Sequence, residues 1–139
     1  MSQLVLGLGN RLRGDDGAGA EVAARVRSVP SQQVNDPGTL LDIWSRSDDV
    51  IVVDAVYSGA PVGTIHRLSV EQSALPVTSA TSSHAFGLAE VVELARVLGK
   101  LPSSVRVYGI EIDSLTPGEP LSPRVEAAVQ EVVKEIDGA

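Results

Sequence analysis

The chain of 139 residues contains no cysteine. This absence excludes disulfide bonds, zinc sites built from thiolates and a thiol nucleophile. The sequence also lacks an apolar stretch of membrane-spanning length, and its amino terminus has no basic region followed by a long apolar run. We therefore expect a soluble cytoplasmic domain that has no membrane partner.

Positive charge is scarce as well. Eleven Lys and Arg residues face 18 Asp and Glu residues, which gives a formal net charge of -7 at pH 7. An acidic surface argues against nucleic acid or an anionic membrane as the partner. The length predicts a single domain over residues 1–139, which we expect to be monomeric, and a hydrophobic content of 43% is enough for a core.

Strand-like and helix-like segments alternate along the chain. The runs 4–8 and 50–53 lack the polar–apolar alternation of half-exposed strands, so they are predicted to be buried on both faces. The expected strands are 4–8, 32–34, 50–53, 64–68 and 105–110, and the expected helices are 17–28, 40–44, 88–98 and one that opens at Ser122-Pro123. This order predicts a three-layer α/β/α sandwich with a mostly parallel, roughly five-stranded sheet.

The helix at 88–98 is the clearest of the chain. Leu88, Val91, Val92, Ala95 and Leu98 recur at helical spacing, a glycine suits the left-handed terminus and a proline follows it. The only tryptophan, Trp44, is interpreted as a packing residue. His66 lies inside an expected strand, which favours a structural or surface role.

The loop after the first strand combines glycines with two acids. Gly7-x-Gly9 invites a dinucleotide-binding interpretation, but Leu12 stands at the third glycine position, and two carboxylates stand where a pyrophosphate needs amide donors. Such a loop is better suited to holding a cation. For Asp15 we expect a role in capping the next helix, and for Asp16 a functional role.

Ligands of open α/β sheets bind beyond the carboxyl ends of the strands. That rule selects Asp16 after the first strand and Asp54 after the run 50–53, and a third candidate is His84 at the start of the helix 88–98. A helix amino terminus disfavours the imidazolium, and neutral imidazole is the form that coordinates metal. Two carboxylates and one imidazole would form an incomplete shell for a divalent transition ion. Spacing alone leaves this open, because a histidine at a helix start is more often a hydrogen-bonding residue.

The loop and several later motifs resemble a known family. The segment 7–19, with the order Gly-Leu-Gly-Asn-Arg-Leu-Arg-Gly-Asp-Asp-Gly-Ala-Gly, is similar to the amino-terminal signature of the hydrogenase maturation proteases. The likeness continues through Val53-Asp54-Ala55, the loop 58–63, the segment 82–88 around His84, and Tyr108-Gly109-Ile110-Glu111. It therefore covers nearly the whole chain in the right order. Val62 departs from the proline that the family often has there.

The resemblance implies an endopeptidase that removes the carboxy-terminal extension of a nickel–iron hydrogenase large-subunit precursor after nickel insertion. It places Asp16, Asp54 and His84 as nickel ligands, with the nickel delivered in the substrate and zinc or cadmium as possible surrogates. Asp16 and Asp54 are the expected catalytic carboxylates of an aspartyl-type reaction. Whether a carboxylate activates the water or the ion polarises the scissile carbonyl stays open.

Two alternatives belong to other functional classes. One is a non-catalytic nickel-binding or chaperone module for hydrogenase assembly, which processing of a precursor in vitro would separate from a protease. The other is a nucleotide-binding domain, favoured only by Gly7-x-Gly9 and the fold class. Calorimetry that detects no nucleotide binding would dispose of it.

Overall fold

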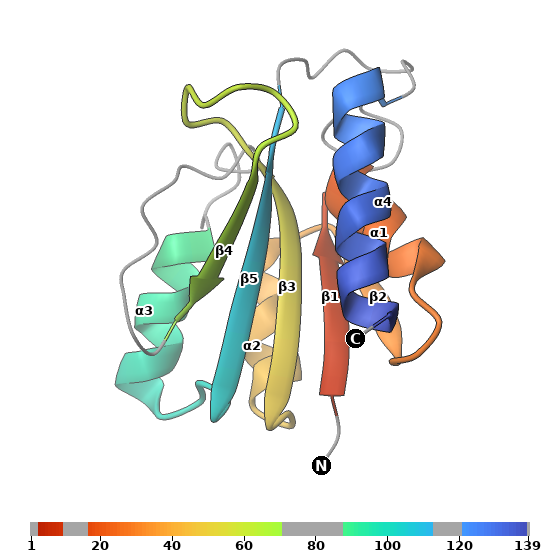
Figure 1. The fold of residues 1–139 in the computed structure, drawn as a ribbon. Helices are drawn as coiled ribbons and strands as arrows, with labels where there is room; N and C mark the ends of the chain where they lie inside the picture. The colour runs from red at the N-terminus through yellow and green to blue at the C-terminus, as the bar shows by residue number, and fades with distance from the viewer. Residues whose placement is uncertain (1–2, 10–16, 71–87, 113–120, 139) are drawn as a thin grey trace.

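The computed structural model describes residues 3–9, 17–70, 88–112 and 121–138. Figure 1 shows a twisted sheet with helices on both of its sides. In chain order the elements are β1 (Gln3–Leu8), α1 (Ala18–Arg25), β2 (Ser31–Val34), a 3-10 turn (Pro37–Thr39), α2 (Leu40–Trp44), β3 (Asp49–Val56), β4 (Ile65–Ser69), α3 (Leu88–Leu98), β5 (Ser104–Glu111) and α4 (Pro123–Asp137).

The five strands form one sheet in the order β2-β1-β3-β5-β4. All neighbouring pairs are parallel except β4 and β5, which are antiparallel. Apolar side chains of α1 and α4 cover one face of this sheet, and those of α2 and α3 cover the other. The predicted three-layer α/β/α sandwich with a mostly parallel five-stranded sheet is therefore confirmed. In the described part of the chain, no helix has the length and apolar character needed to cross a bilayer.

Strand β3 lies at the centre of the sheet and separates the two cores. Val50 and Val52 pack toward α2 and α3, whereas Ile51 and Val53 pack toward α1 and α4. All four side chains are at most 1% exposed. Strand β1 behaves in the same way, so the prediction that both runs are buried on both faces is confirmed.

Other local expectations also hold. Trp44 is buried in the core beside α3 and serves as a packing residue. Gly99 has a φ of 70°, as expected for the left-handed end of α3. Leu98 is an exception, because it is 52% exposed rather than part of the apolar face of its helix.

Two predicted boundaries were wrong. Helix α1 ends at Arg25 and does not continue to residue 28, because the next amides bind elsewhere: the N–H groups of Arg27 and Ser28 donate to the carboxylate of Asp137 at the end of α4. Strand β3 does not end at Asp54-Ala55 as expected but runs on to Val56, since its pairing with β5 continues that far.

Helix α1 approaches the sheet so closely that no side chain fits between them. A Cβ atom added to Gly19 would lie 2.3 Å from the carbonyl oxygen of Val53 and 2.5 Å from that of Leu8. A Cβ atom on Gly7 would lie 2.2 Å from the carbonyl oxygen of Gly19. These two glycines therefore fix the start of α1 directly over the carboxyl ends of β1 and β3.

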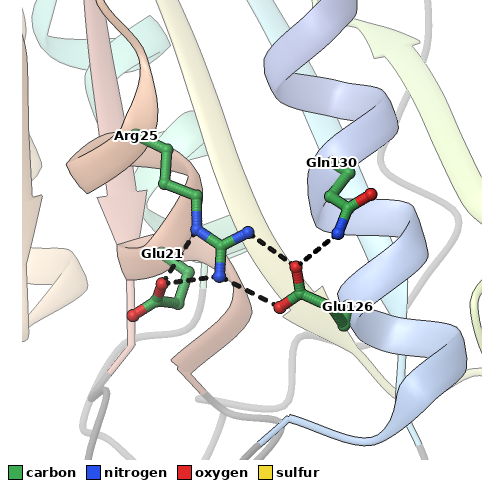
Figure 2. A network of polar contacts seen from close by, with 4 residues as sticks. All are labelled: Glu21, Arg25, Glu126 and Gln130. Carbon is green, nitrogen blue, oxygen red and sulfur yellow. Dashed lines mark hydrogen bonds and ion pairs between the residues drawn. The ribbon is translucent and has the colours of Figure 1, made fainter.

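A polar network joins α1 to α4 on the outside of the molecule (Figure 2). The guanidinium of Arg25 donates to both carboxylate oxygens of Glu126, at 2.7 and 3.0 Å, and also to Glu21 one turn earlier. Gln130 donates a further hydrogen bond to Glu126. The hydrogen bond from Arg25, and then that from Gln130, lower the pKa of Glu126 from 4.5 to about 2.

The contact at Gly19 predicts a large effect of one methyl group. Gly19→Ala should lower the free energy of unfolding by roughly 3 kcal/mol or more, because backbone oxygens cannot move aside as a flexible side chain can. Gly38→Ala is the matched control, since its nearest neighbour would be Asp36 Oδ1 at 3.4 Å, and it should stay within about 0.5 kcal/mol. Urea unfolding of both variants measures the difference, and equal stability of the two would contradict the close contact.

The network around Glu126 predicts a dependence on acid. Its folded pKa is lowered, so the charge stabilises the protein fully above pH 4.5, and this contribution is lost as the pH falls toward 2. Glu126→Gln should cost roughly 0.5–1 kcal/mol at neutral pH, since both partners are a third exposed, and the difference from wild type should shrink below pH 4.5. Thermal unfolding across this range tests it. The exposed pair within α3 offers the control Glu93→Gln, which should cost about 0.5 kcal/mol at most.

Candidate functional site

Asp54 is the one predicted site residue that the structure describes. It lies close to the carboxyl end of β3 and is paired in register with Gly109 of β5. Side chains alternate along a strand, so Asp54 points to the same face as Val50 and Val52, which is the face that α2 and α3 cover. Its side chain is 0% exposed. The structure therefore places a buried carboxylate near the carboxyl edge of the sheet.

The other predicted ligands, Asp16 and His84, lie outside the described residues, as does Asp15. Their convergence with Asp54 stays a prediction. Among the residues that the structure describes, no three His, Asp or Glu side chains gather in a way that could hold a metal ion.

A second buried carboxylate, Glu111, lies two residues beyond Gly109 on β5. It is 1% exposed and shares the sheet face of Asp54. The backbone N–H of Ser58 donates to Oε2 at 2.8 Å, and the hydroxyl of Ser58 donates to Oε1 at 2.6 Å. The N–H of Gly59 donates to Oε2 at 3.3 Å. Glu111 thus binds the backbone of the loop that leaves β3.

His66 of β4 completes this cluster. Its Nε2 lies 3.1 Å from Oε1 of Glu111, and its side chain is 21% exposed. Burial by itself raises the pKa of Glu111, but the two hydrogen bonds from Ser58, followed by those from His66 and Gly59, outweigh burial and lower the pKa below 4.5. Glu111 is therefore ionised at neutral pH, so Nε2 of His66 carries the proton and donates it to this hydrogen bond.

The register of the sheet aligns the cluster with Asp54. Gly109 is paired with Asp54 on one side and with His66 on the other, so the three residues form a row across β3, β5 and β4. Gly109 contributes no side chain to the row, and the space beside it holds Val56, whose Cγ1 would lie 3.1 Å from an added Cβ. Asp54, Glu111 and His66 therefore lie on one face of the sheet near its carboxyl edge, without forming a metal-binding group.

Asp54 was selected from the sequence and His66 was assigned a structural or surface role, but neither Glu111 nor Ser58 was assigned a role, although both lie in segments that carry the family resemblance. Glu111 did carry a signal, because it is an acid at the end of an apolar strand, on the same alternating face as Val105 and Val107. The role of Ser58 had no such signal, since its partner is 53 residues away. His66 does lie within a strand, as expected.

Comparison with known proteins gives the decisive observation. The sequence model of the hydrogenase maturation protease family matches residues 24–139. The chain belongs to the hydrogenase maturation protease family. Membership in this family makes it a protease, and hence a hydrolase.

Individual relatives agree with the family assignment. The Hydrogenase 2 maturation protease of Escherichia coli (strain K12) is 32% identical over 146 residues, which cover 98% of this chain and 88% of that protein. The hydrogenase expression/formation protein HupD of Thiocapsa roseopersicina is 35% identical over 147 residues, covering 91% of this chain and 66% of HupD. The similarity to a hydrogenase maturation protease thus extends over almost the whole chain.

A solved structure shows the same fold. The hydrogenase maturating endopeptidase HybD from Escherichia coli superimposes with a TM-score of 0.75 at 25% sequence identity. The match covers 98% of this chain and 90% of that one. The arrangement of the sheet and its helices is therefore that of a hydrogenase maturation endopeptidase.

Proposed function

We propose that this protein is the endopeptidase that removes the carboxy-terminal extension from a nickel–iron hydrogenase large-subunit precursor, in the cytoplasm, once nickel has been inserted. The family assignment carries this proposal. Asp16, Asp54 and His84 are the proposed nickel-recognising residues, and Asp16 and Asp54 the proposed catalytic carboxylates. The nickel belongs to the substrate, because it arrives bound to the precursor.

The position of α1 supports a common site for Asp16 and Asp54. Gly19 approaches the carbonyl of Val53, the residue directly before Asp54, and Asp16 precedes Gly19 by only three residues. Three residues of chain span at most about 11 Å. The proposed ligand pair therefore requires no rearrangement of the sheet.

The position of α3 supports His84 as the third member. Helix α3 packs on the sheet face toward which Asp54 points. The helix ends near the start of β5, so it begins on the side nearer the carboxyl edge of the sheet (Figure 1). His84 precedes Leu88 by four residues. A carboxylate and a neutral imidazole suit a divalent nickel ion.

Asp54 is suited to acid–base chemistry because the sheet fixes its backbone and burial removes it from bulk water. A carboxylate in such a place can accept a proton from an attacking water and return it to the leaving amine. Precursor cleavage by the purified protein, measured with nickel-loaded and nickel-free precursor, tests the proposal. Shortening of the nickel-loaded precursor alone is expected, and failure to shorten either form would refute it.

Asp54→Asn separates catalysis from folding. The substitution keeps size and shape but removes the charge, so precursor cleavage should be abolished while the melting temperature is unchanged or higher, because a buried charge usually costs stability. Asp42→Asn is the matched control: Asp42 is an exposed residue of α2 whose partner is Arg46, and it should keep full activity. Complete processing by Asp54→Asn, or unfolding caused by it, would show that Asp54 is structural.

Metal affinity gives an independent test. Three protein ligands should bind free nickel, zinc or cadmium only loosely, and His84→Ala should weaken this binding further. His66→Ala is the control, because Nε2 of His66 is already engaged with Glu111, and its affinity should stay close to wild type. Calorimetric titration of both variants decides between the two histidines. Equally tight binding by His84→Ala and wild type would remove His84 from the site.

A further inference from the structure

We propose that Tyr57 contacts the precursor polypeptide and that Glu111 is a positioning residue that holds Tyr57 in place for this contact. The inference rests on the proposed function, since it names residues through which the same substrate would be recognised. It concerns the loop of residues 57–63, which leaves β3 directly after the edge where Asp54 lies.

Glu111 holds the first half of this loop. Its carboxylate accepts hydrogen bonds from two successive backbone amides, those of Ser58 and Gly59, and from the Ser58 hydroxyl. Bonds to an ionised acceptor are stronger than neutral ones. Because the acceptor belongs to β5, which is paired on both sides within the sheet, the backbone just after Tyr57 is tied to the rigid sheet.

The second half of the loop is held by backbone contacts. The N–H of Gly63 donates to the carbonyl of Glu111, and the N–H of Glu111 donates to the carbonyl of Thr64, both at 2.9 Å. Gly63 has a φ of 91°, and an added Cβ would lie 2.9 Å from the carbonyl oxygen of Arg124 at the start of α4. Both ends of the loop are therefore fixed, one to β5 and the other between β5 and α4.

Tyr57 stands on this fixed loop with its side chain 63% exposed. The other exposed large apolar residues of the described part, Val97 and Leu98, lie at the end of α3 near the opposite edge of the sheet (Figure 1). Tyr57 follows Asp54 by three residues, roughly 10 Å along an extended strand. A tyrosine has few rotatable side-chain bonds, and where the adjoining backbone is already fixed it loses little conformational entropy when a polypeptide packs on it, which is why tyrosine is common at binding hot spots.

A buried ionised carboxylate is an expensive way to hold an ordinary turn, since the charge must be removed from water. The free-energy cost of burying this charge is understandable if function requires the loop to keep one conformation. The partner that fits is a segment of the precursor chain with an apolar side chain to cover the ring and a polar group for the hydroxyl. Such a segment would pass within roughly 10 Å of Asp54, the length of three residues of extended chain.

Kinetics of precursor processing test this assignment. Tyr57→Ala should raise KM about tenfold with kcat within about twofold of wild type, since it removes a binding contact that is made before and during the reaction. Tyr57→Phe should stay within about twofold in both constants. Val97→Ala, an exposed apolar residue at the far edge, is the control and should change neither. An unchanged KM in Tyr57→Ala would overturn the proposal.

A double-mutant cycle tests the positioning role. Glu111→Met removes every acceptor, so it should reproduce the rise in KM, whereas Glu111→Gln keeps an acceptor for the two amides and should restore most of the affinity. In the Tyr57→Ala background Glu111→Met should add little, because Glu111 acts through Tyr57. If Glu111→Met does not fold, Ser58→Ala, which removes only the hydroxyl donor, replaces it. An undiminished effect in the Tyr57→Ala background would show that Glu111 acts by another route.

A binding measurement keeps this test separate from that of the proposed function. The affinity of the wild type and of Tyr57→Ala for the precursor is measured by calorimetry, in parallel with cleavage. Binding that weakens about tenfold in Tyr57→Ala, without cleavage by either protein, would support the contact and refute the protease. Cleavage by both with equal KM and equal affinity would support the protease and refute the contact.

Discussion

The arrangement of the carboxyl edge depends on the contact between α1 and the backbone of the sheet. Gly7 and Gly19 allow this contact, because a methyl group at either position would overlap a backbone carbonyl. The start of α1 is thereby fixed over the ends of β1 and β3. Asp54 is buried at this same edge, close to the start of the helix. The two glycines thus determine the position of α1 because they lack a side chain, although they have no reactive group.

Two buried carboxylates share this edge and have different surroundings. Glu111 is surrounded by donors from Ser58, Gly59 and His66, and these lower its pKa, so its charge is used to hold a loop. Asp54 lies one strand away on the same face, inside the rigid sheet. We infer a division of roles in which Glu111 positions the loop and Asp54 takes part in the proposed reaction. The order of the strands, with β3 beside β5, therefore brings the two carboxylates to the same edge.

Most of the fold could be predicted because its signals are local. The apolar run 4–8 and the helical spacing of residues 88–98 are each contained in about ten residues, and both elements were found where the sequence indicated. The errors have distant causes. Helix α1 ends early because Asp137, more than 100 residues further on, binds the amides of Arg27 and Ser28. Strand β3 is longer than expected because β5 continues to pair with it.

The sequence by itself determined the layered architecture and selected Asp54, because a carboxylate directly after a run of β-branched residues must lie at the carboxyl end of a buried strand. The family resemblance was also contained in the sequence, and the family comparison confirms it. The cluster of Ser58, His66 and Glu111 was decided only by tertiary structure. Its members come from a loop and two strands, and they meet because antiparallel β4 returns beside β5 in one particular register. No spacing along the chain encodes that register, since it results from packing across the whole sheet.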